Sequence, residues 1–375
     1  MRKHSFVVAA KAALTAMMLA FGIAQANASD IGREIQSNLD VLRSFKPPKS
    51  GAALNRFSEN LDKAWRLYEA NSAVAIPILR SQLTAELARP QPSSLVLLDL
   101  GYFLAGHDEA SLSLARDALM KIDVKDPGIL VSANSLFYFT HRLVPRRDPG
   151  MLDWIDKAFL RNRVTVVVPQ HAMSLNADST CIFLYGLYCE GAEAHLLPLL
   201  NDPAVRLSVL RVLFVVGTPD SVPAVAATLS PEQPVAEFEE ALGNLVGNGG
   251  PRGREVILAL DPAQFPEQHR AILERSREFM ASISYEKLKA RFEPSDGGPK
   301  LNETELLARL EAMRNNYGID DTLSPQAVLS SSLPAETLIK QLEAIRAVTF
   351  NRISDEAMHD VAMTNALLMA LRYRR

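Results

Sequence analysis

The sequence predicts an all-α fold, an α-solenoid of stacked helical hairpins with a C-terminal three-helix cap. Three observations support this prediction. Apolar residues recur three and four positions apart along most of the chain, which is the spacing of one helix face. Pro, Gly, Asp and Ser bound these segments, as they do at helix ends. A unit of two short helices also recurs with a period of roughly 30 residues, and such a period is typical of solenoids.

The central unit covers residues 201–230 and reads as two short antiparallel helices. Asp202 stands at an N-cap position and Pro203 at the first helical position, where its missing N–H costs nothing. An almost unbroken apolar run follows, and Gly217 ends the first helix. We expect Asp220 and Ser221 to cap the second helix, whose apolar face is Val222, Val225, Ala226 and Leu229. Neither helix buries its apolar surface alone, so the unit needs similar neighbours.

The same pattern recurs on both sides of this unit. The prolines that end successive units, Pro203, Pro231 and Pro262, are 28 and 31 residues apart. The motif Asp202-Pro203-x-Val205-Arg206, followed by Gly217, resembles a HEAT-like, armadillo-type repeat of the bacterial phycobilisome-lyase kind, over residues 180–262. The resemblance implies a stacked-helix scaffold with a concave binding face, in which Asp202 and Arg206 take part in a ladder between repeats. It implies no chemistry, because such repeats serve many functions.

Residues 1–28 have the pattern of a secretory signal peptide. Arg2 and Lys3 precede an apolar stretch over residues 12–24, and two small-x-small cleavage motifs follow, ending at Ala26 and Ala28. A signal anchor is the alternative, but the 13 residues of the apolar stretch are too few to span a membrane. We therefore expect a mature chain without a membrane span, located in the periplasm or secreted.

Helical patterns begin soon after this segment. They cover residues 31–45, 60–67, 74–87, 93–104, 108–122, 127–143, 149–160 and 265–283. A tetratricopeptide array is the alternative for the N-terminal half, although the Trp/Gly/Tyr spacing of that repeat is missing. A β-branched run at residues 164–168 interrupts the pattern. We assign residues 30–290 to the solenoid.

The C-terminal part is predicted to be a separate piece. Residues 291–300 contain a Pro/Gly-rich stretch that is typical of a linker. Asn302 and Glu305 then form a capping-box-like start of a helix, and further helices are expected at residues 334–348 and 354–375. Residues 301–375 are either a cap on the open end of the solenoid or a functional module.

Charge argues against nucleic acid as a partner. Without Arg2, Lys3 and Lys11, 37 basic residues face 43 acidic ones. Basic residues nevertheless gather in one region on predicted turns: Arg142, Arg146, Arg147, Arg161 and Arg163. They are interpreted either as solvated loop charges or as a patch that binds an anionic envelope ligand.

Cys181 and Cys189 are the only cysteines, and an exported protein would ordinarily pair them. On one continuous helix their Cα atoms would lie ~12 Å apart, beyond the ~7 Å limit for a disulfide. We therefore predict two free thiols. The alternative is that Gly186 breaks the helix and lets the sulfur atoms meet.

Candidates for chemistry are few. Glu356 and His359, with Asp360, share one face of the last helix at a spacing used by metal sites, but such sites need a second copy of the motif. The sequence has no nucleophile elbow, phosphate-binding loop or zinc-protease motif, and no cofactor is predicted. The first functional hypothesis is a scaffold that binds another protein through its concave face. The alternatives are an anionic-ligand binder and a helical metal-dependent enzyme.

Overall fold

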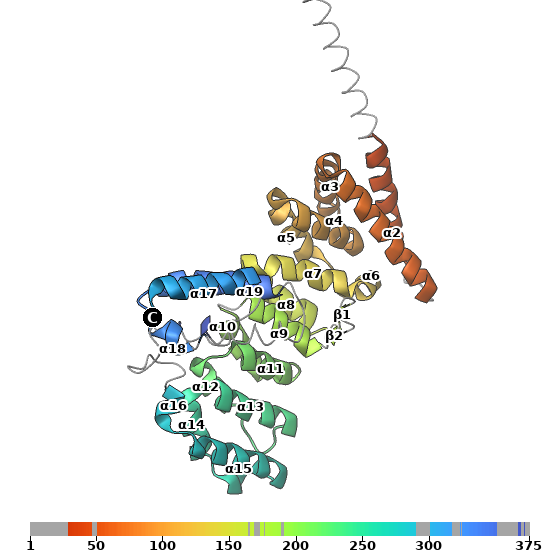
Figure 1. Cartoon of the computed structure of the whole chain (residues 1–375). Coiled ribbons are helices and arrows are strands. Elements are labelled where there is room, and N and C mark those ends of the chain that lie inside the picture. Colours follow the sequence, from red (N-terminus) through yellow and green to blue (C-terminus); the bar gives the residue numbers. More distant parts are fainter. Residues whose placement is uncertain are drawn as a thin grey trace, which may run out of the picture. The chain divides into compact units, whose positions relative to one another are not determined.

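A computed structural model describes the chain at residues 29–46, 51–163, 166–168, 173–175, 177–188, 191–289, 301–316, 323, 325–350, 367–368 and 371 (Figure 1). Over these residues the protein is helical, apart from two three-residue strands. The predicted all-helical class is therefore confirmed. The chain divides into two compact units, residues 1–143 and 144–375, and each is treated by itself below.

The first unit is built around one buried helix, α4. It begins with an unlabelled helix over residues 29–43, followed by α2 (Gly51–Ala70), α3 (Ser72–Leu87), α4 (Ser94–His107), η1 (Glu109–Ser111), α5 (Leu112–Lys121), α6 (Pro127–Val131) and α7 (Ala133–Leu143). Helices α3, α5, α6 and α7 all contact α4. Because α4 has neighbours on several sides, its apolar residues are buried all round and not along one stripe.

The sequence predicted some of these helices closely and others poorly. In the first helix the expected stripe is buried: Ile31, Ile35, Leu39 and Leu42. Helix α2 begins at Gly51, well before the expected residue 60. The helix predicted over 127–143 is two helices, because Ser132 leaves the helical conformation at φ −111° and ψ 25°. Asp126 starts the first of them by accepting a hydrogen bond from the Gly128 N–H at 2.7 Å.

The second unit is longer. It contains η2 (Val144–Arg146), α8 (Met151–Ile155), the π-helical turn η3 (Asp156–Leu160), β1 (Val166–Val168), β2 (Met173–Leu175), α9 (Ala177–Tyr188), α10 (Ala192–Leu196), η4 (Leu197–Asn201), α11 (Arg206–Val216), η5 (Pro219–Ser221), α12 (Val222–Ala226), α13 (Val235–Gly247), α14 (Gly250–Ala259), η6 (Pro262–Gln264), α15 (Glu267–Ser282), α16 (Tyr285–Lys289), α17 (Glu303–Asn316), α18 (Pro325–Leu329) and α19 (Ala335–Phe350).

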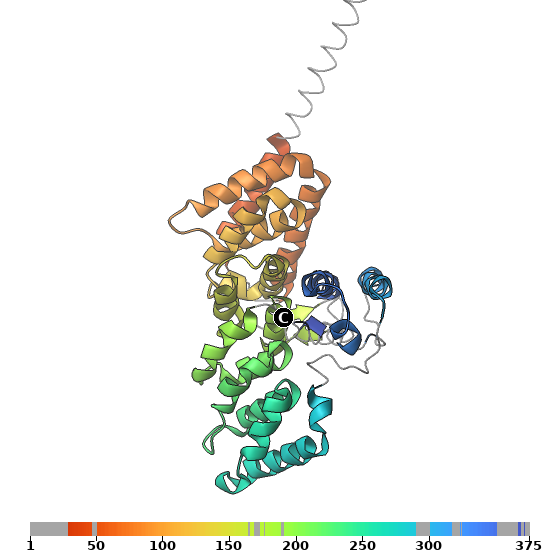
Figure 2. The same cartoon turned by 90° about the vertical axis from the view of Figure 1, so that its left-hand side faces the viewer.

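Its middle part consists of two rows of helices. In one row α9 contacts α11, α11 contacts α13, and α13 contacts α15. In the other row η4 contacts α12, α12 contacts α14, and α14 contacts α16. Both views show the first row following one direction through this unit (Figures 1 and 2). Helices of successive predicted hairpins therefore contact one another in both rows, and the solenoid arrangement stays a prediction.

The ends of the central hairpin differ from the prediction. Helix α11 starts at Arg206, after Val205, so Asp202 and Pro203 lie in a preceding turn where Asp202 accepts a hydrogen bond from the Ala204 N–H at 3.0 Å. The cap of η5 is the Thr218 hydroxyl, which accepts from the Asp220 N–H at 3.2 Å. Gly217 does end α11, and its N–H donates to the Leu213 carbonyl at 2.6 Å.

Residues 166–168 of the β-branched run form a strand, which the all-α prediction did not include. Strands β1 and β2 pair antiparallel, with Val166 opposite Leu175 and Val168 opposite Met173. The partner strand β2 was missed, because three residues give too short a pattern to recognise.

The C-terminal piece has an apolar core of its own. Asn302 caps α17 by accepting a hydrogen bond from the Glu305 N–H at 2.8 Å, as predicted. The core contains leucines from α17 and α19 together with Leu367, Leu368 and Leu371. Helix α19 contacts α9, in the middle of the unit. The linker predicted at 291–300 lies outside the described residues, and closing the open end of a solenoid stays a prediction.

Candidate functional site

The row of helices α9, α11 and α13 is joined by a chain of polar side chains centred on Asp178. This carboxylate is only 7% exposed. It accepts hydrogen bonds from the Ser208 hydroxyl at 2.6 Å and from the Arg211 guanidinium, both on α11. Burial alone would raise the pKa of Asp178, but the hydrogen bonds from Ser208 and Arg211 and the charge of Arg163 lower it instead. Asp178 is therefore ionised at neutral pH.

Arg211 continues the chain of contacts to the next helix. Its Nε donates to Glu240 Oε1 on α13 at 3.0 Å, while its Nη1 binds Asp178 on α9. Asn244 of α13 donates to the Leu210 carbonyl at 2.8 Å, and Asn248, the residue after α13, donates to the Leu213 carbonyl at 2.9 Å and to the Phe214 carbonyl at 3.0 Å. These side-chain hydrogen bonds to the backbone of α11 hold the two helices in register.

A second set of ion pairs lies at the beginning of α11. Arg161 donates to Asp202 Oδ2 at 2.8 Å, and Arg206 donates to Glu237 Oε2 on α13 at 3.2 Å. The Nε of Arg206 also donates to the Leu200 carbonyl at 2.7 Å. Asp202 and Arg206 thus each pair with a residue of an adjacent hairpin and not with each other. The HEAT-like resemblance implies that Asp202 and Arg206 take part in a ladder between repeats, and this role stays a prediction.

One surface of α11 and α13 is open. The Phe214 ring is 51% exposed and lies against Gly247, where an added Cβ would be 3.1 Å from the ring. A Cβ added at Gly243 would meet nothing within 4 Å. Arg211 and Glu240 are partly exposed on the same two helices. We call Arg211, Phe214, Glu240, Gly243 and Gly247 the α11–α13 surface. Aromatic and Arg side chains are the residues that most often anchor protein interfaces.

Most of the basic residues that the sequence analysis grouped as a possible anion-binding patch contact acidic or aromatic side chains in the structure. Arg146 pairs with Asp148, Arg161 with Asp202, and Arg163 with Asp178 and Ser208. Arg147 and Arg163 have positive φ angles of 54° and 49° and lie outside the helices, whereas Arg142 lies in the last turn of α7 and not in a connecting turn as predicted. Arg142 belongs to the other unit and lies over the Tyr102 ring, at 5.2 Å from its centroid.

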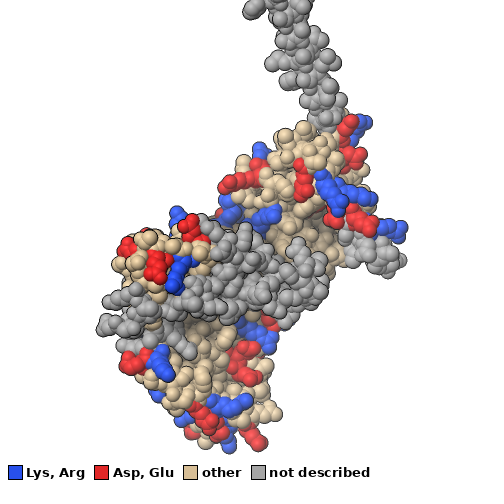
Figure 3. All heavy atoms as spheres, in the orientation of Figure 1, with Lys and Arg blue, Asp and Glu red and all other residues tan. Residues whose placement is uncertain are grey.

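These pairings leave little uncompensated positive charge. Over the face seen in Figure 3, the Lys and Arg side chains are interspersed with Asp and Glu. The interpretation as solvated and locally paired loop charges therefore fits the geometry better than an anion-binding patch.

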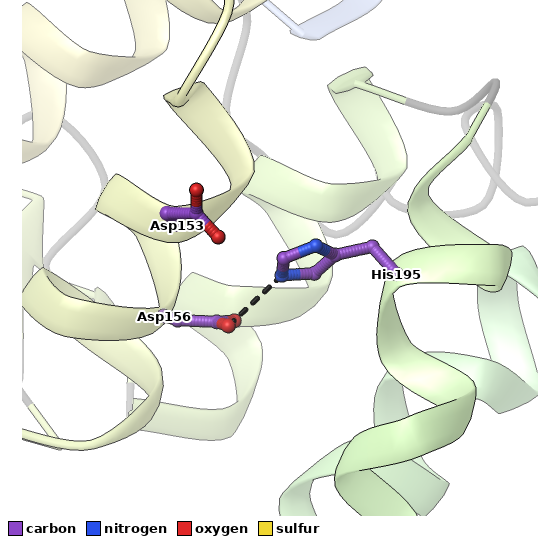
Figure 4. Close-up of side chains that lie close together, drawn as sticks. All are labelled: Asp153, Asp156 and His195. Carbon is purple, nitrogen blue, oxygen red and sulfur yellow. Dashed lines mark hydrogen bonds and ion pairs between the residues drawn. The ribbon is translucent and has the colours of Figure 1, made fainter.

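A group of three side chains that could hold a metal ion, not found from the sequence, lies in the second unit. Asp153 of α8, Asp156 of η3 and His195 of α10 place one ligand atom each within 4.8 Å of one another (Figure 4). His195 Nε2 lies 2.9 Å from Asp156 Oδ2, and the buried Tyr185 hydroxyl donates to Asp156 Oδ1. The hydrogen bond that the His195 imidazole donates to the Asp156 carboxylate raises the pKa of His195. The only sequence signal was Asp153-x-x-Asp156, two carboxylates three residues apart.

The remaining candidate residues from the sequence are the two cysteines and the Glu/His/Asp group near the C-terminus. Cys181 is a free, buried thiol on α9, and burial raises its pKa, so it has no thiolate character at neutral pH. Helix α9 passes through Gly186 without a break, which favours the unpaired interpretation. Cys189, Glu356, His359 and Asp360 lie outside the described residues.

Comparison with known proteins found no match among protein-family models, curated proteins or solved structures. The HEAT-like resemblance therefore stays an interpretation of this chain's own residues. None of the helices in the described parts of the chain has both the length and the apolar composition of a membrane span.

Proposed function

We propose that this protein is an exported α-solenoid scaffold that binds an extended segment of another protein through the α11–α13 surface. Support for the solenoid comes from the two rows of helices, in which every hairpin contacts the next. Rows of this kind present long surfaces suited to extended partners. Support for export comes from the pattern of residues 1–28.

The half-exposed ring of Phe214 is the observation that carries the proposal. A phenylalanine on a helix that is otherwise buried loses apolar contact area unless a partner covers it. Next to it, the Arg211–Glu240 pair offers a donor and an acceptor that are already held in place by Asp178. Gly243 lets a second chain approach the backbone of α13 closely, and Gly247 gives room to the Phe214 ring itself. An apolar anchor with fixed polar groups around it is the usual composition of a protein interface.

The alternatives have less support. An anionic ligand would need free cations, and Arg146, Arg161 and Arg163 are each paired with an acid. A metal-dependent enzyme centred on Glu356 and His359 has no described geometry. A buried aromatic contact also predicts weak dependence on salt, whereas an anionic ligand would be released by salt.

A site-specific crosslink tests the proposal. Phe214 is replaced by the photoreactive residue p-benzoylphenylalanine, which keeps an aromatic ring in the same place, and the cells are irradiated. The matched control carries the same residue at Phe279 on α15, which is 49% exposed. We expect one protein to be captured at position 214 and not at position 279. The captured protein, purified, should then bind the wild-type chain and bind Phe214→Ala at least about tenfold more weakly.

Two results would contradict the proposal. One is capture of the same set of proteins at positions 214 and 279, which would indicate non-specific contact. The other is unchanged affinity of the captured protein for Phe214→Ala, which would place its binding site elsewhere.

A further inference from the structure

We propose that Asp153, Asp156 and His195 form a binding site for a divalent transition-metal ion of the zinc type. Two carboxylates and one imidazole are ligands that Zn²⁺ accepts. They come from two segments of the chain, α8–η3 and α10, which α9 holds together by contacting both. The site lies apart from the α11–α13 surface and does not depend on the proposed scaffold function.

The distances fit this assignment. In a tetrahedral zinc site with bonds of about 2.1 Å, the ligand atoms lie about 3.4 Å apart. Here one atom from each side chain lies within 4.8 Å of the other two, and His195 Nε2 is already 2.9 Å from Asp156 Oδ2. Side-chain rotations alone can bring Asp153 into range, since its carboxylate is exposed and one of its oxygens points toward the imidazole (Figure 4).

Asp156 is oriented in the way that a metal-ligating carboxylate usually is. Its Oδ1 accepts a hydrogen bond from the Tyr185 hydroxyl, which leaves Oδ2 directed at His195. Tyr185 is itself fully buried on α9, so the orientation of the carboxylate is fixed by the core. Hydrogen bonds from such neighbouring residues hold metal ligands in place. Asp156 also opens a π-helical turn, and π-helical turns occur frequently at functional sites.

An ion pair between His195 and Asp156 alone would not explain why a second carboxylate, that of Asp153, lies beside the imidazole. The Asp153 carboxylate makes no hydrogen bond or ion pair with any residue that the structure describes. The nearest lysine in sequence, Lys157, lies over the Trp154 ring, with Nζ 5.4 Å from the centroid. Two carboxylates therefore face one imidazole, and this group carries net negative charge in either protonation state of His195. A divalent ion balances that charge, and water would fill the open coordination position.

Metal titration of the mature chain tests the site. The protein is stripped with a chelator and titrated with Zn²⁺ by calorimetry, and with Co²⁺ by its visible absorption, which reports nitrogen and oxygen coordination. We expect one equivalent to bind. The variants Asp153→Asn and His195→Gln should weaken binding by at least about tenfold. Asp153 is exposed, so its variant keeps the test valid even if His195→Gln fails to fold.

Three controls distinguish this site from others. His107→Gln removes a histidine that pairs with Glu69 in the first unit and should leave the affinity unchanged. His359→Gln removes the histidine that the sequence analysis singled out near the C-terminus and should do the same. Tyr185→Phe keeps all three ligands and should weaken binding about 10- to 100-fold by loosening Asp156. The proposal is overturned if no ion binds, or if Asp153→Asn and His195→Gln bind Zn²⁺ as wild type does.

Discussion

Asp99 is a buried carboxylate without a counter-ion. It lies in the middle of α4, is 7% exposed, and forms no ion pair with the residues that the structure describes. The Trp65 indole N–H donates to Asp99 Oδ1 at 2.7 Å, and the Asn38 amide lies 3.5 Å from Oδ2 and 2.9 Å from the Tyr68 hydroxyl. Burial raises the pKa of Asp99 to about 6, and the Trp65 hydrogen bond lowers it only in part.

Asp99 should make the stability of the protein depend on pH. Its folded-state pKa is above the unfolded value, so its contribution is most favourable below about pH 4 and is lost as pH rises through 6. Asp99→Asn cannot ionise. Relative to wild type, this variant should therefore gain about 2 kcal/mol of unfolding free energy between pH 4.5 and 7.5. Urea unfolding of both proteins at the two pH values measures the difference, and a difference that does not change with pH would refute the assignment.

Neither Asp99 nor the metal-ligating group could have been found from the sequence. Asp99 interrupts an apolar helix, but its partners Asn38 and Trp65 lie 61 and 34 residues away. Asp156 and His195 are 39 residues apart and meet only because α9 packs between their segments. Spacing along one helix reveals neighbours within a few residues and says nothing about contacts of this range. Sequence reasoning instead selected Glu356 and His359, whose spacing on one helix is visible without tertiary structure.

At the scale of elements, the helix patterns were predictable where a helix has one buried face. The first helix, α3 and α15 follow their apolar stripes, and Gly217 and Asn302 act at the predicted helix ends. The start of α11 was predicted too early, although Asp202 still accepts a hydrogen bond from the Ala204 N–H through Oδ1 while Oδ2 accepts from Arg161. Residues 203–205 form a turn before the regular helix, and helix ends of this kind are defined only to within one or two residues.

Gly217 should be essential to the turn that follows α11. A Cβ at this position would lie 2.4 Å from the Leu213 carbonyl oxygen, which is backbone and cannot move aside alone. Gly217→Ala should therefore lower the unfolding free energy by about 1–3 kcal/mol. Gly243→Ala is the matched control, because its Cβ meets nothing within 4 Å and Gly243 lies inside α13. It should raise stability by about 0.5–1 kcal/mol. Denaturant midpoints of the two variants should move in opposite directions, and equal shifts would contradict the argument.

For the whole molecule, the repeat period predicted more than any single motif did. The prolines at 203, 231 and 262 mark hairpins whose helices do fall into two contacting rows. The period cannot specify which polar residues join the hairpins. Asp178, Arg211 and Glu240 belong to three helices that follow one another in one row. Arg211 and Glu240 are each the sixth residue of their helix, but they carry opposite charges. The polar contacts between hairpins depend on tertiary packing and cannot be predicted from the repeat, whereas the period of the apolar residues can be read directly from the sequence.

Export of the chain is the remaining prediction at this scale. The positive residues, the short apolar stretch and the small residues before Asn27 and Ser29 together predict cleavage at one of these positions. Cleavage at either position would leave the helix over residues 29–43 intact, including its buried Ile31. Mass spectrometry of the protein from a bacterial host should therefore find Asn27 or Ser29 at the N-terminus.

A single substitution makes this test stricter. Ala26 belongs to both small-x-small motifs, so Ala26→Arg should block both cleavages and leave a heavier precursor. Gln25→Arg adds the same charge one residue away but leaves both motifs unchanged, and should be processed normally. A wild-type chain that keeps Met1, or equal processing of the two variants, would show that residues 1–28 are not removed as a signal peptide. The proposed partner would then have to be sought inside the cell.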